Sequence, residues 1–462
     1  KANYALNPIP ELSPEAFAVR GGLTWSGPDR RSPYAGERNN LMPRIGFAYT
    51  LTQKTILRGG YGLFFDTLGI LKTLPYQTGF SQSTPIQASL DNGQTYIATL
   101  ANPFPNGLIP PAGPAKGLRT NLGQGIDYYY RDMKQAYSQR WSFGVQRQLP
   151  AQFMIDVSYV GNRATRIGVE RNINVTPAEY LSRSPVRDQA RINYLNQQFP
   201  NPFRGTDPIF GANISRASLL RPYPQFGDIN AFEPIGYSWY HSLQIRSERR
   251  FAQGFTFQLA YTWSKTMEAT EFLNPQDPTP YEVISAFDRT HRIGASGIWE
   301  VPLGRGRKFA SGASGLLDAL IGGWKVGTVF TMQSGQPLGF GNAILLTHPH
   351  EVSLSEPDVD RWFNINAFNR IPGEQLASNY RQLPLRFSGI RSDGQFAIDM
   401  SFSKYFRFNE RTQLQFRADS YNFTNTTSFA NPNTTPTNSA FGRVTSTQND
   451  ARNWQLALRL IF

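Results

Sequence analysis

The sequence of 462 residues contains no cysteine. This absence excludes disulfide-stapled scaffolds, thiolate metal centres and cysteine nucleophiles. Charge is also scarce, because Asp, Glu, Lys and Arg make up 17% of the chain, where about a quarter is usual in soluble domains. No apolar run approaches the ~20 residues that a membrane-spanning helix needs. The sequence therefore excludes helical membrane spans, and its 13% aromatic content argues against wholesale disorder.

Alternation of apolar and polar residues with a period of two dominates the sequence. Trp141, Phe143 and Val145 alternate with polar neighbours, and after Pro150–Gln152 the alternation resumes at Phe153. Two alternating runs joined by a tight turn are typical of a β-hairpin. The pattern predicts about eleven strands of roughly 9–14 residues, the length of a tilted membrane-spanning strand. The runs lie near residues 45–51, 56–65, 141–146, 153–159, 239–246, 255–264, 293–301, 326–332, 396–402, 414–418 and 454–462.

The connections between these runs alternate in length. Short turns are expected at Thr52–Lys54, Pro150–Gln152, Ala252–Gly254 and Asn409–Arg411. Long polar segments rich in Pro, Gly and Asn separate the hairpins, and one medium turn is expected to hold a short helix at Leu316–Ile321. Short turns at one end and long loops at the other are typical of outer-membrane barrels. A soluble propeller would instead repeat at a fixed period of ~40–50 residues. The long segments span residues 67–135, 167–234, 267–287, 334–395 and 424–450.

The charges and the aromatic residues favour a membrane barrel over a soluble sandwich. A charge at the lipid midplane costs about 2–4 kcal/mol in a barrel, and the apolar phase of the strands is nearly free of charge. A sandwich predicts the same alternation, but aromatics at both ends of the strands are typical of interfacial girdles. We therefore predict an all-β, antiparallel transmembrane β-barrel with long extracellular loops. Trp141, Trp239, Trp263 and Trp454 are expected near the long-loop end, and Trp299, Trp324 and Phe462 near the other.

The charged residues of the polar phase are the candidates for the barrel lumen. Five arginines could guide an anionic solute, but cross-strand pairing with the carboxylates is the favoured interpretation. The arginines are Arg140, Arg246, Arg292, Arg417 and Arg459, and the carboxylates are Asp156, Glu248, Glu300, Asp399 and Asp419.

The C-terminus carries a further candidate signal. Apolar residues occupy every second position up to a terminal Phe462, which resembles the signal by which outer-membrane barrels are recognised for insertion. An ordinary last strand that ends in Phe is the alternative. The residues concerned are Trp454, Leu456, Leu458, Leu460 and Phe462.

Other motifs carry little chemistry. His348-Pro349-His350 lies in a long acidic loop, but its spacing matches no established metal site, so we expect a solvated loop and no metal. Gly304-Arg305-Gly306-Arg307-Lys308 lacks the following Ser/Thr helix start of a phosphate loop and is interpreted as a basic periplasmic turn. Catalytic motifs are missing, and the basic residues are dispersed rather than clustered as nucleic-acid sites require. We therefore expect no catalytic residues, no cofactor and no nucleic acid.

Ten stretches in order resemble the C-terminal barrel portion of the Oar-like TonB-dependent outer-membrane receptors. The resemblance spans most of the chain from Pro43 onward. The stretches are PRIGFAYTL (43–51), ILRGGYGLFFD (56–66), WSFGVQRQLP (141–150), VSYVGNRATRI (157–167), LAYTWSKTME (259–268), DRTHRIGASGIWEVPLGRGRKF (288–309), GGWKVGTVFTMQSGQPL (322–338), DRWFNINAF (360–368), LQFRADSYNFTN (414–425) and FGRVTSTQNDARNWQLALRLIF (441–462).

The resemblance implies a 22-stranded barrel with an N-terminal plug, driven by the inner-membrane TonB system. Eleven strands are about half of that barrel, and no segment here is recognisable as a plug or a TonB box. The chain begins with Lys1 and no leader segment follows, so we expect a fragment or a processed product. Residues 1–42 are expected to form an extracellular loop or an incomplete preceding strand region, and residues 43–462 the C-terminal part of the barrel.

The implied function is energised transport of a bulky solute across the bacterial outer membrane. The implied partners are outer-membrane lipid and lipopolysaccharide, the barrel assembly machinery, the TonB system and an unknown solute. The alternatives are a passive porin or surface-adhesion barrel, a soluble all-β carbohydrate-binding protein, and an enzyme, for which the sequence shows no site.

Overall fold

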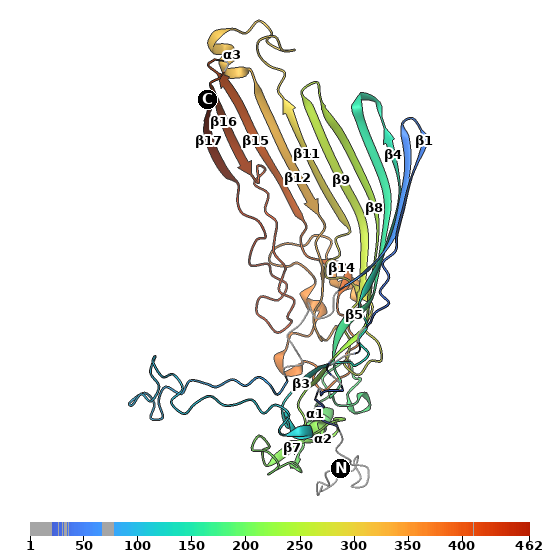
Figure 1. The fold of residues 1–462 in the computed structure, drawn as a ribbon, viewed down its shortest axis with the longest axis vertical. Helices are drawn as coiled ribbons and strands as arrows, with labels where there is room; N and C mark the ends of the chain where they lie inside the picture. The colour runs from blue at the N-terminus through green and yellow to red at the C-terminus, as the bar shows by residue number, and fades with distance from the viewer. Residues whose placement is uncertain are drawn as a thin grey trace.

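The computed structural model describes residues 21–25, 27–29, 31, 35, 37–66, 78–409 and 411–462. Its main element is one large sheet of long strands that stand side by side as a curved wall (Figure 1). The strands on its path are β1 (Arg44–Thr52), β2 (Thr55–Phe65), β4 (Tyr137–Gln148), β5 (Phe153–Asn172), β8 (Ile229–Ala252), β9 (Phe255–Ala269), β11 (His291–Glu300), β12 (Trp324–Gln333), β15 (Gln395–Arg407), β16 (Gln413–Tyr421) and β17 (Asn453–Ile461). We call these eleven strands the wall.

Each strand of the wall pairs antiparallel with the next along the chain, in the order β1-β2-β4-β5-β8-β9-β11-β12-β15-β16-β17. The predicted all-β, antiparallel fold is therefore confirmed. The path holds eleven strands, whereas the total of 22 in a complete barrel stays a prediction. The edges β1 and β17 lie at opposite sides of the wall, so the sheet is open (Figure 1).

Short strands and helices lie in the connections between the strands of the wall. The short strands are β3 (Ile126–Tyr129), β6 (Gln198–Pro200), β7 (Asn213–Ser215), β10 (Val283–Ile284), β13 (Pro337–Leu338) and β14 (Phe387–Arg391). The helices are α1 (Gln189–Asn196), α2 (Arg216–Leu219) and α3 (Gly315–Ile321). The predicted helix at Leu316–Ile321 is thus present. None of the helices described is long and apolar enough to span a membrane.

Three strands are longer than the expected 9–14 residues, so the predicted strand lengths are corrected: β9 exceeds them by one residue, with 15, and two other strands exceed them by more. β5 has 20 residues and β8 has 24. Beyond the alternating region they continue to pair with each other, with Val169 opposite Glu233 and Asn172 opposite Asn230, while β3 pairs with β8 in parallel. The alternation stops there because this extension lies among the loops, where Val169, Ile229 and Ala231 are buried.

The connections are segregated as predicted. The short turns lie at one end of the wall with α3, and the long loops gather at the other end (Figure 1). Part of the β2–β4 connection, coloured light blue, projects as an arm away from the remaining loops. The expected strand or loop region at residues 1–42 is described only in part: residues 1–20 lie outside the described residues, and the described part beyond them contains no strand.

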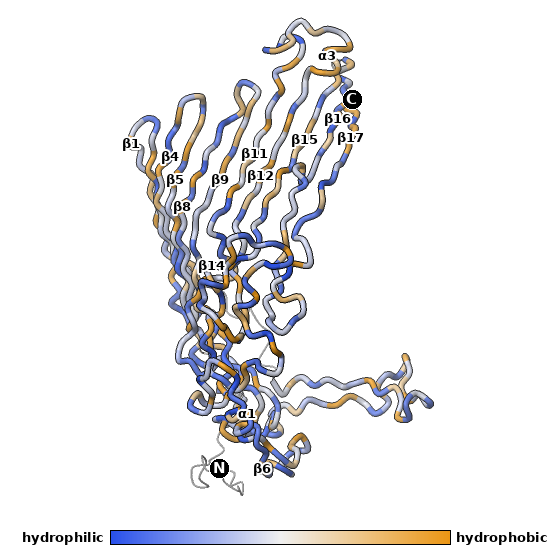
Figure 2. The backbone as a smooth tube through the Cα atoms, turned by 180° about the vertical axis from the view of Figure 1, so that it is seen from behind, coloured by the Kyte–Doolittle hydropathy of each residue, from blue (hydrophilic) through white to orange (hydrophobic). Residues whose placement is uncertain are grey.

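The pairing register separates two chemically different faces along the whole wall, and hydropathy alternates along its strands (Figure 2). Leu259 on β9 lies opposite Ala295, and the next residue, Gln258, lies opposite Ser296. The register also places the tryptophans at the expected levels. Trp454 pairs with Ser420 at the loop end, and Trp299 pairs with Phe255 at the short-turn end.

The buried cores lie at the loop end rather than in the wall. A first cluster centres on Phe340, Phe363 and Phe441, a second on Leu195 and Leu219, and a third on Leu122, Ile126, Phe226 and Ile229. We call the folded loop segments that carry these clusters and their links the cap. It comprises residues 114–136, 173–228, 270–290, 334–394 and 422–452.

Candidate functional site

The polar face of the wall brings all ten charged candidates onto one surface. Antiparallel partners point to the same side of a sheet, and side chains two residues apart on a strand do so as well. Arg246 lies opposite Asp156 and Ala260, and Ala260 lies opposite Gly294 on β11. Continued across the registers, the same face carries Arg140, Arg246, Arg292, Arg417, Arg459, Asp156, Glu248, Glu300, Asp399 and Asp419. That this face lines a lumen stays a prediction.

The ion pairs on this face differ from the expected cross-strand ladder. Arg246 bonds Glu248 at 2.8 Å, and Arg417 bonds Asp419 at 2.9 Å. Both pairs join residues i and i+2 of a single strand. The arginine side chain is long enough to reach its neighbour on the same face, and Asp156, opposite Arg246, accepts a hydrogen bond from the Ser158 hydroxyl instead.

The remaining candidates have other partners. Glu300 binds Lys325 at 2.8 Å across the β11–β12 pair, and Asp399 accepts the Asn422 N–H at 2.8 Å. The Arg140 guanidinium lies 5.3 Å from the centre of the Phe64 ring. Among the described carboxylates none forms an ion pair with Arg140, Arg292 or Arg459. These arginines therefore keep hydrogen-bonding capacity for solvent or a solute.

The polar face is also hollowed. A hollow of about 500 Å³ spans β9, β11, β12, β15 and β16. Its lining includes Gln258, Ser296, Asp399, Arg417 and Asp419. Polar and charged groups of both signs line this open hollow together with apolar side chains such as Val329 and Met400.

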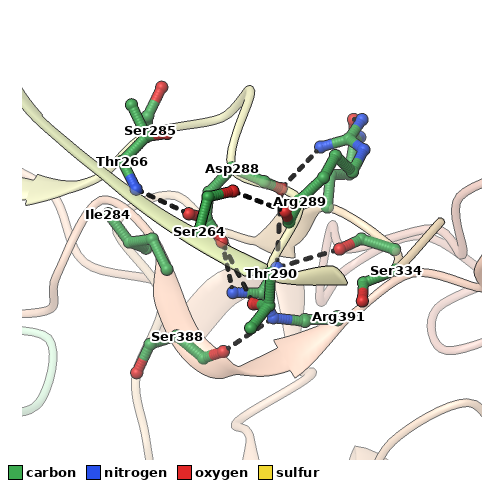
Figure 3. Close-up of polar contacts among 12 residues, drawn as sticks. Ser264, Thr266, Ile284, Ser285, Asp288, Arg289, Thr290, Ser334, Ser388 and Arg391 are labelled. Atoms are coloured by element: carbon green, nitrogen blue, oxygen red, sulfur yellow. Dashed lines mark hydrogen bonds and ion pairs between the residues drawn. The ribbon is translucent and has the colours of Figure 1, made fainter. Parts of the chain in front are cut away.

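The wall joins the cap through a buried carboxylate that the sequence analysis did not single out. β10 and β11 both pair with β9, but residues 285–290 between them bulge away from it. Asp288 lies in this bulge and is 1% exposed. It accepts the backbone N–H of Thr266 at 2.7 Å and the Thr290 hydroxyl at 3.4 Å (Figure 3). The carboxylate therefore replaces the backbone acceptor that the bulge removes from the ladder.

Arginines from two loops complete this junction. Arg391 of β14 binds Asp288 at 2.7 Å and also donates to the carbonyls of Gly335 and Ser388 (Figure 3). Arg289 donates to the Gln336 side chain at 3.1 Å, and burial, together with the nearby Arg391 charge, lowers its pKa. The junction thus ties the β9–β11 loop to the β12–β15 loop.

Further contacts fix the same two loops. Arg386 binds Glu268 at 2.8 Å and Glu271 at 2.9 Å. Asn274 exchanges two hydrogen bonds with the backbone of Arg381. A hydrogen bond from the hydroxyl of Tyr380 to the carboxylate of Asp277 raises the pKa of Tyr380. The cap is therefore held by specific polar contacts as well as by its apolar clusters.

The third loop of the cap, between β5 and β8, is linked to the β12–β15 loop. Ser182 donates its N–H to Ser378 and accepts the N–H of Tyr380, at 2.9 and 2.8 Å. Arg187 donates to the Gln375 carbonyl at 2.8 Å. Three long loops thus form one folded layer above the wall. In the sequence, residues of this layer stand out only within the family resemblance, in stretches such as DRTHR (288–292) and DRWFNINAF (360–368).

The weaker candidates fall outside any cluster. The rings of His348 and His350 stack with centres 5.7 Å apart, and His350 lies 3.9 Å from Glu351. Among the described residues, no group of three or more His, Asp or Glu side chains could hold a metal ion.

The predicted C-terminal insertion signal lies on the apolar face of β17 and beyond its end. Its side chains are between 51% and 93% exposed, and β17 pairs on one side only. An exposed apolar edge suits recognition by another protein or strand. Recognition for insertion stays a prediction for Trp454, Leu456, Leu458, Leu460 and Phe462.

Solved structures with a similar chain course come from outer-membrane proteins. The outer membrane transporter YddB from Escherichia coli is 12% identical, with a TM-score of 0.44 over 91% of this chain and 40% of that chain. The siderophore receptor PirA from Acinetobacter baumannii is 10% identical, with a TM-score of 0.40 over 90% and 40%. The pyoverdine receptor FpvA from Pseudomonas aeruginosa is 11% identical, with a TM-score of 0.39 over 91% and 36%. The chain thus spans less than half the length of these structures.

The family comparison covers almost the whole chain. No curated protein matches the sequence. The family model described as outer membrane beta barrel domain matches residues 3–455, which include every strand of the wall up to the first three residues of β17. The chain therefore belongs to the outer membrane β-barrel domain family and resides in the bacterial outer membrane.

Proposed function

We propose that the chain forms one side of a TonB-dependent transporter barrel that takes up a bulky solute. The observation that carries this proposal is the continuous polar face, with its ten charged residues and its hollow of about 500 Å³. In outer-membrane barrels the polar face lines the lumen and the apolar face meets lipid. The lumen candidates would then guide a polar solute past the wall.

The open edges support a large barrel. Because every step along the eleven-strand path is antiparallel, β1 and β17 run in the same direction. Lipid does not tolerate an unpaired sheet edge. Antiparallel closure therefore requires an odd number of further strands between β1 and β17. A 22-stranded transporter barrel would supply eleven and meet this requirement.

The cap supports the function of a receptor rather than that of a passive porin. In this family long loops face the outside, so the cap would be the first part of the chain that a solute meets. A layer with buried cores and the Asp288–Arg391 junction offers a defined binding surface. The resemblance to Oar-like receptors supports energy supply by the TonB system. We assign the chain no catalytic role, and its other partners would be lipopolysaccharide and the barrel assembly machinery.

The proposal can be tested on the full-length protein from outer-membrane vesicles. A plugged receptor should give no steady conductance in planar lipid bilayers, and it should be captured by the purified periplasmic domain of TonB. Steady conductance without TonB capture would overturn the proposal in favour of a porin. Protein that stays in solution without detergent would overturn it in favour of a soluble binding protein.

A further inference from the structure

The turn between β11 and β12 differs from the short turns of the wall. Residues 302–323, here called the α3 turn, contain the helix α3 with three outward leucines. Leu316, Leu317 and Leu320 are 85%, 54% and 70% exposed, and Figure 2 colours this segment as largely hydrophobic. Three neighbouring exposed leucines are unfavourable in water and indicate an interaction surface.

The helix is fixed on the apolar side of the wall. The Trp324 indole N–H donates to the Leu320 carbonyl at 2.8 Å, and the Trp324 ring packs against Phe416 with centres 6.1 Å apart. Both rings belong to the apolar phase, since Trp324 lies opposite Lys404 and Lys404 lies opposite Phe416. The Asp318 carboxylate accepts the Arg305 N–H at 2.6 Å and holds the turn in place. The leucines of α3 thus continue the lipid-facing surface.

A buried cation lies beneath this arrangement. Lys404 is 3% exposed although it belongs to the apolar phase. Its ammonium lies 5.6 Å from the Trp324 ring centre and 5.1 Å from that of Phe406, and it has no hydrogen-bond partner among the described residues. Asp318 supplies only a more distant negative charge. Burial of an ammonium is unfavourable without a close anion. The rings of Trp324 and Phe406 offset part of this cost by cation–π contact.

The other half of the α3 turn is basic. Arg305, Arg307 and Lys308 precede the helix, and Asp318 is the one carboxylate within residues 302–323. Arg307 lies 3.7 Å from Glu300, but Glu300 is already bound to Lys325 at 2.8 Å. The turn therefore carries positive charge beside an apolar helix, the combination by which interfacial helices select anionic membranes.

We propose that the α3 turn is a binding site for anionic phospholipid of the periplasmic leaflet. The leucines of α3 enter the acyl layer, while Arg305 and Lys308 bind headgroup phosphates. The occupant is lipid rather than protein because the helix is fixed against the same apolar face that contacts the membrane. This inference does not depend on what the barrel transports.

The chain itself contains no cysteine, and any cysteine elsewhere in the full-length protein is first replaced by serine so that each variant carries a single label. Leu317→Cys in the full-length protein is labelled with the environment-sensitive dye NBD and reconstituted into vesicles of phosphatidylglycerol and phosphatidylcholine. Gln53→Cys, in the short β1–β2 turn, is the matched control. We expect a blue-shifted emission at position 317 and roughly threefold stronger quenching by doxyl-labelled lipid than at position 53.

Two further conditions separate lipid binding from simple burial. Vesicles of phosphatidylcholine alone should weaken the quenching at position 317, and replacing Arg305 and Lys308 together by Ala should remove this difference between lipids. Heat-modifiable gel mobility verifies that each variant is folded. Emission at position 317 as polar as at position 53 in both vesicles would overturn the proposal. Shielding that requires an added periplasmic protein would overturn it too.

Discussion

The wall and the cap belong to one chain but place their apolar side chains in opposite environments. In the wall, Leu456 and Leu458 are 69% and 70% exposed, whereas Phe363 and Phe441 in the cap are 0% and 2% exposed. The wall presents its apolar residues to lipid, so alternation and register are sufficient. The cap lies in water, so it needs an interior of its own with particular partners. The wall therefore places its apolar side chains against lipid, whereas the cap packs them against other side chains of the protein.

The largest expected contrast comes from the same truncation in both regions. Phe363→Ala should cost the cap about 3–5 kcal/mol, because a fully buried ring leaves a cavity. Leu458→Ala in the wall should cost below about 1 kcal/mol, because lipid chains are as apolar as leucine and fill the space. Hydrogen exchange of the cap and heat-modifiable mobility of the wall measure the two effects separately. Loss of the wall in Phe363→Ala would show that the two regions unfold as one unit.

The second prediction concerns the wall alone and adds a charge instead of removing an apolar side chain. Leu259 and Gln258 are neighbours on β9, opposite the middle of β11, but lie on opposite faces. Leu259→Arg should destabilise the inserted protein by about 2–4 kcal/mol, the cost of an arginine near the lipid midplane. Gln258→Arg should be tolerated, because its side chain faces the polar side. Urea unfolding from lipid vesicles compares the two variants, and equal stability would show that the faces are wrongly assigned.

The same contrast explains what could be predicted from the sequence. The strands of the wall follow from alternation alone, as in the run from Phe255 to Trp263. The helix α3 follows from an apolar segment between glycines. Both signals are local, since one face of a strand or helix is visible within a few residues.

The cap carries no comparable signal. Phe340, Phe363 and Phe441 pack together although they come from two loops and share no period. Asp288 and Arg391 are 103 residues apart in the chain. Contacts of this kind are set by the folded arrangement of the loops and not by a local pattern. The charged residues of the polar face could be predicted in part. Alternation predicted the face on which they lie, but it did not predict their ion-pair partners.

The Asp288–Arg391 junction tests how firmly two loops of the cap are tied to each other and, through the hydrogen bond from Thr266 to Asp288, to β9. Asp288→Asn keeps the shape but removes the negative charge, which leaves Arg391 partly buried without its anion. We expect a loss of about 1–3 kcal/mol, confined to residues 264–290 and 334–394. Hydrogen exchange resolved by segment measures it, and Asp360→Asn in the exposed Arg443–Asp360 pair is the control with little expected effect. An equal loss in both variants would contradict a special role for the junction.

The smallest expected effect concerns α1 of the cap and its dependence on pH. The Asp188 carboxylate caps this helix by accepting the Arg191 N–H at 2.9 Å and the Ser182 hydroxyl at 2.8 Å. These hydrogen bonds, that of Arg191 first, lower the pKa of Asp188. A carboxyl with a lowered pKa stabilises the fold above its unfolded pKa of about 3.9, and this contribution is lost as pH falls through the lower folded value.

The pH dependence should therefore appear only in the acid range and only in α1. Exchange of the α1 amides, corrected for intrinsic rates, should quicken below pH ~4. Asp188→Ala should show quicker exchange at every pH, because the cap is gone. Asp188→Asn should keep much of the protection, since asparagine also caps helices well, and should lose the pH dependence. An acid transition that persists in Asp188→Asn would place the titrating group elsewhere in the cap and would contradict this assignment.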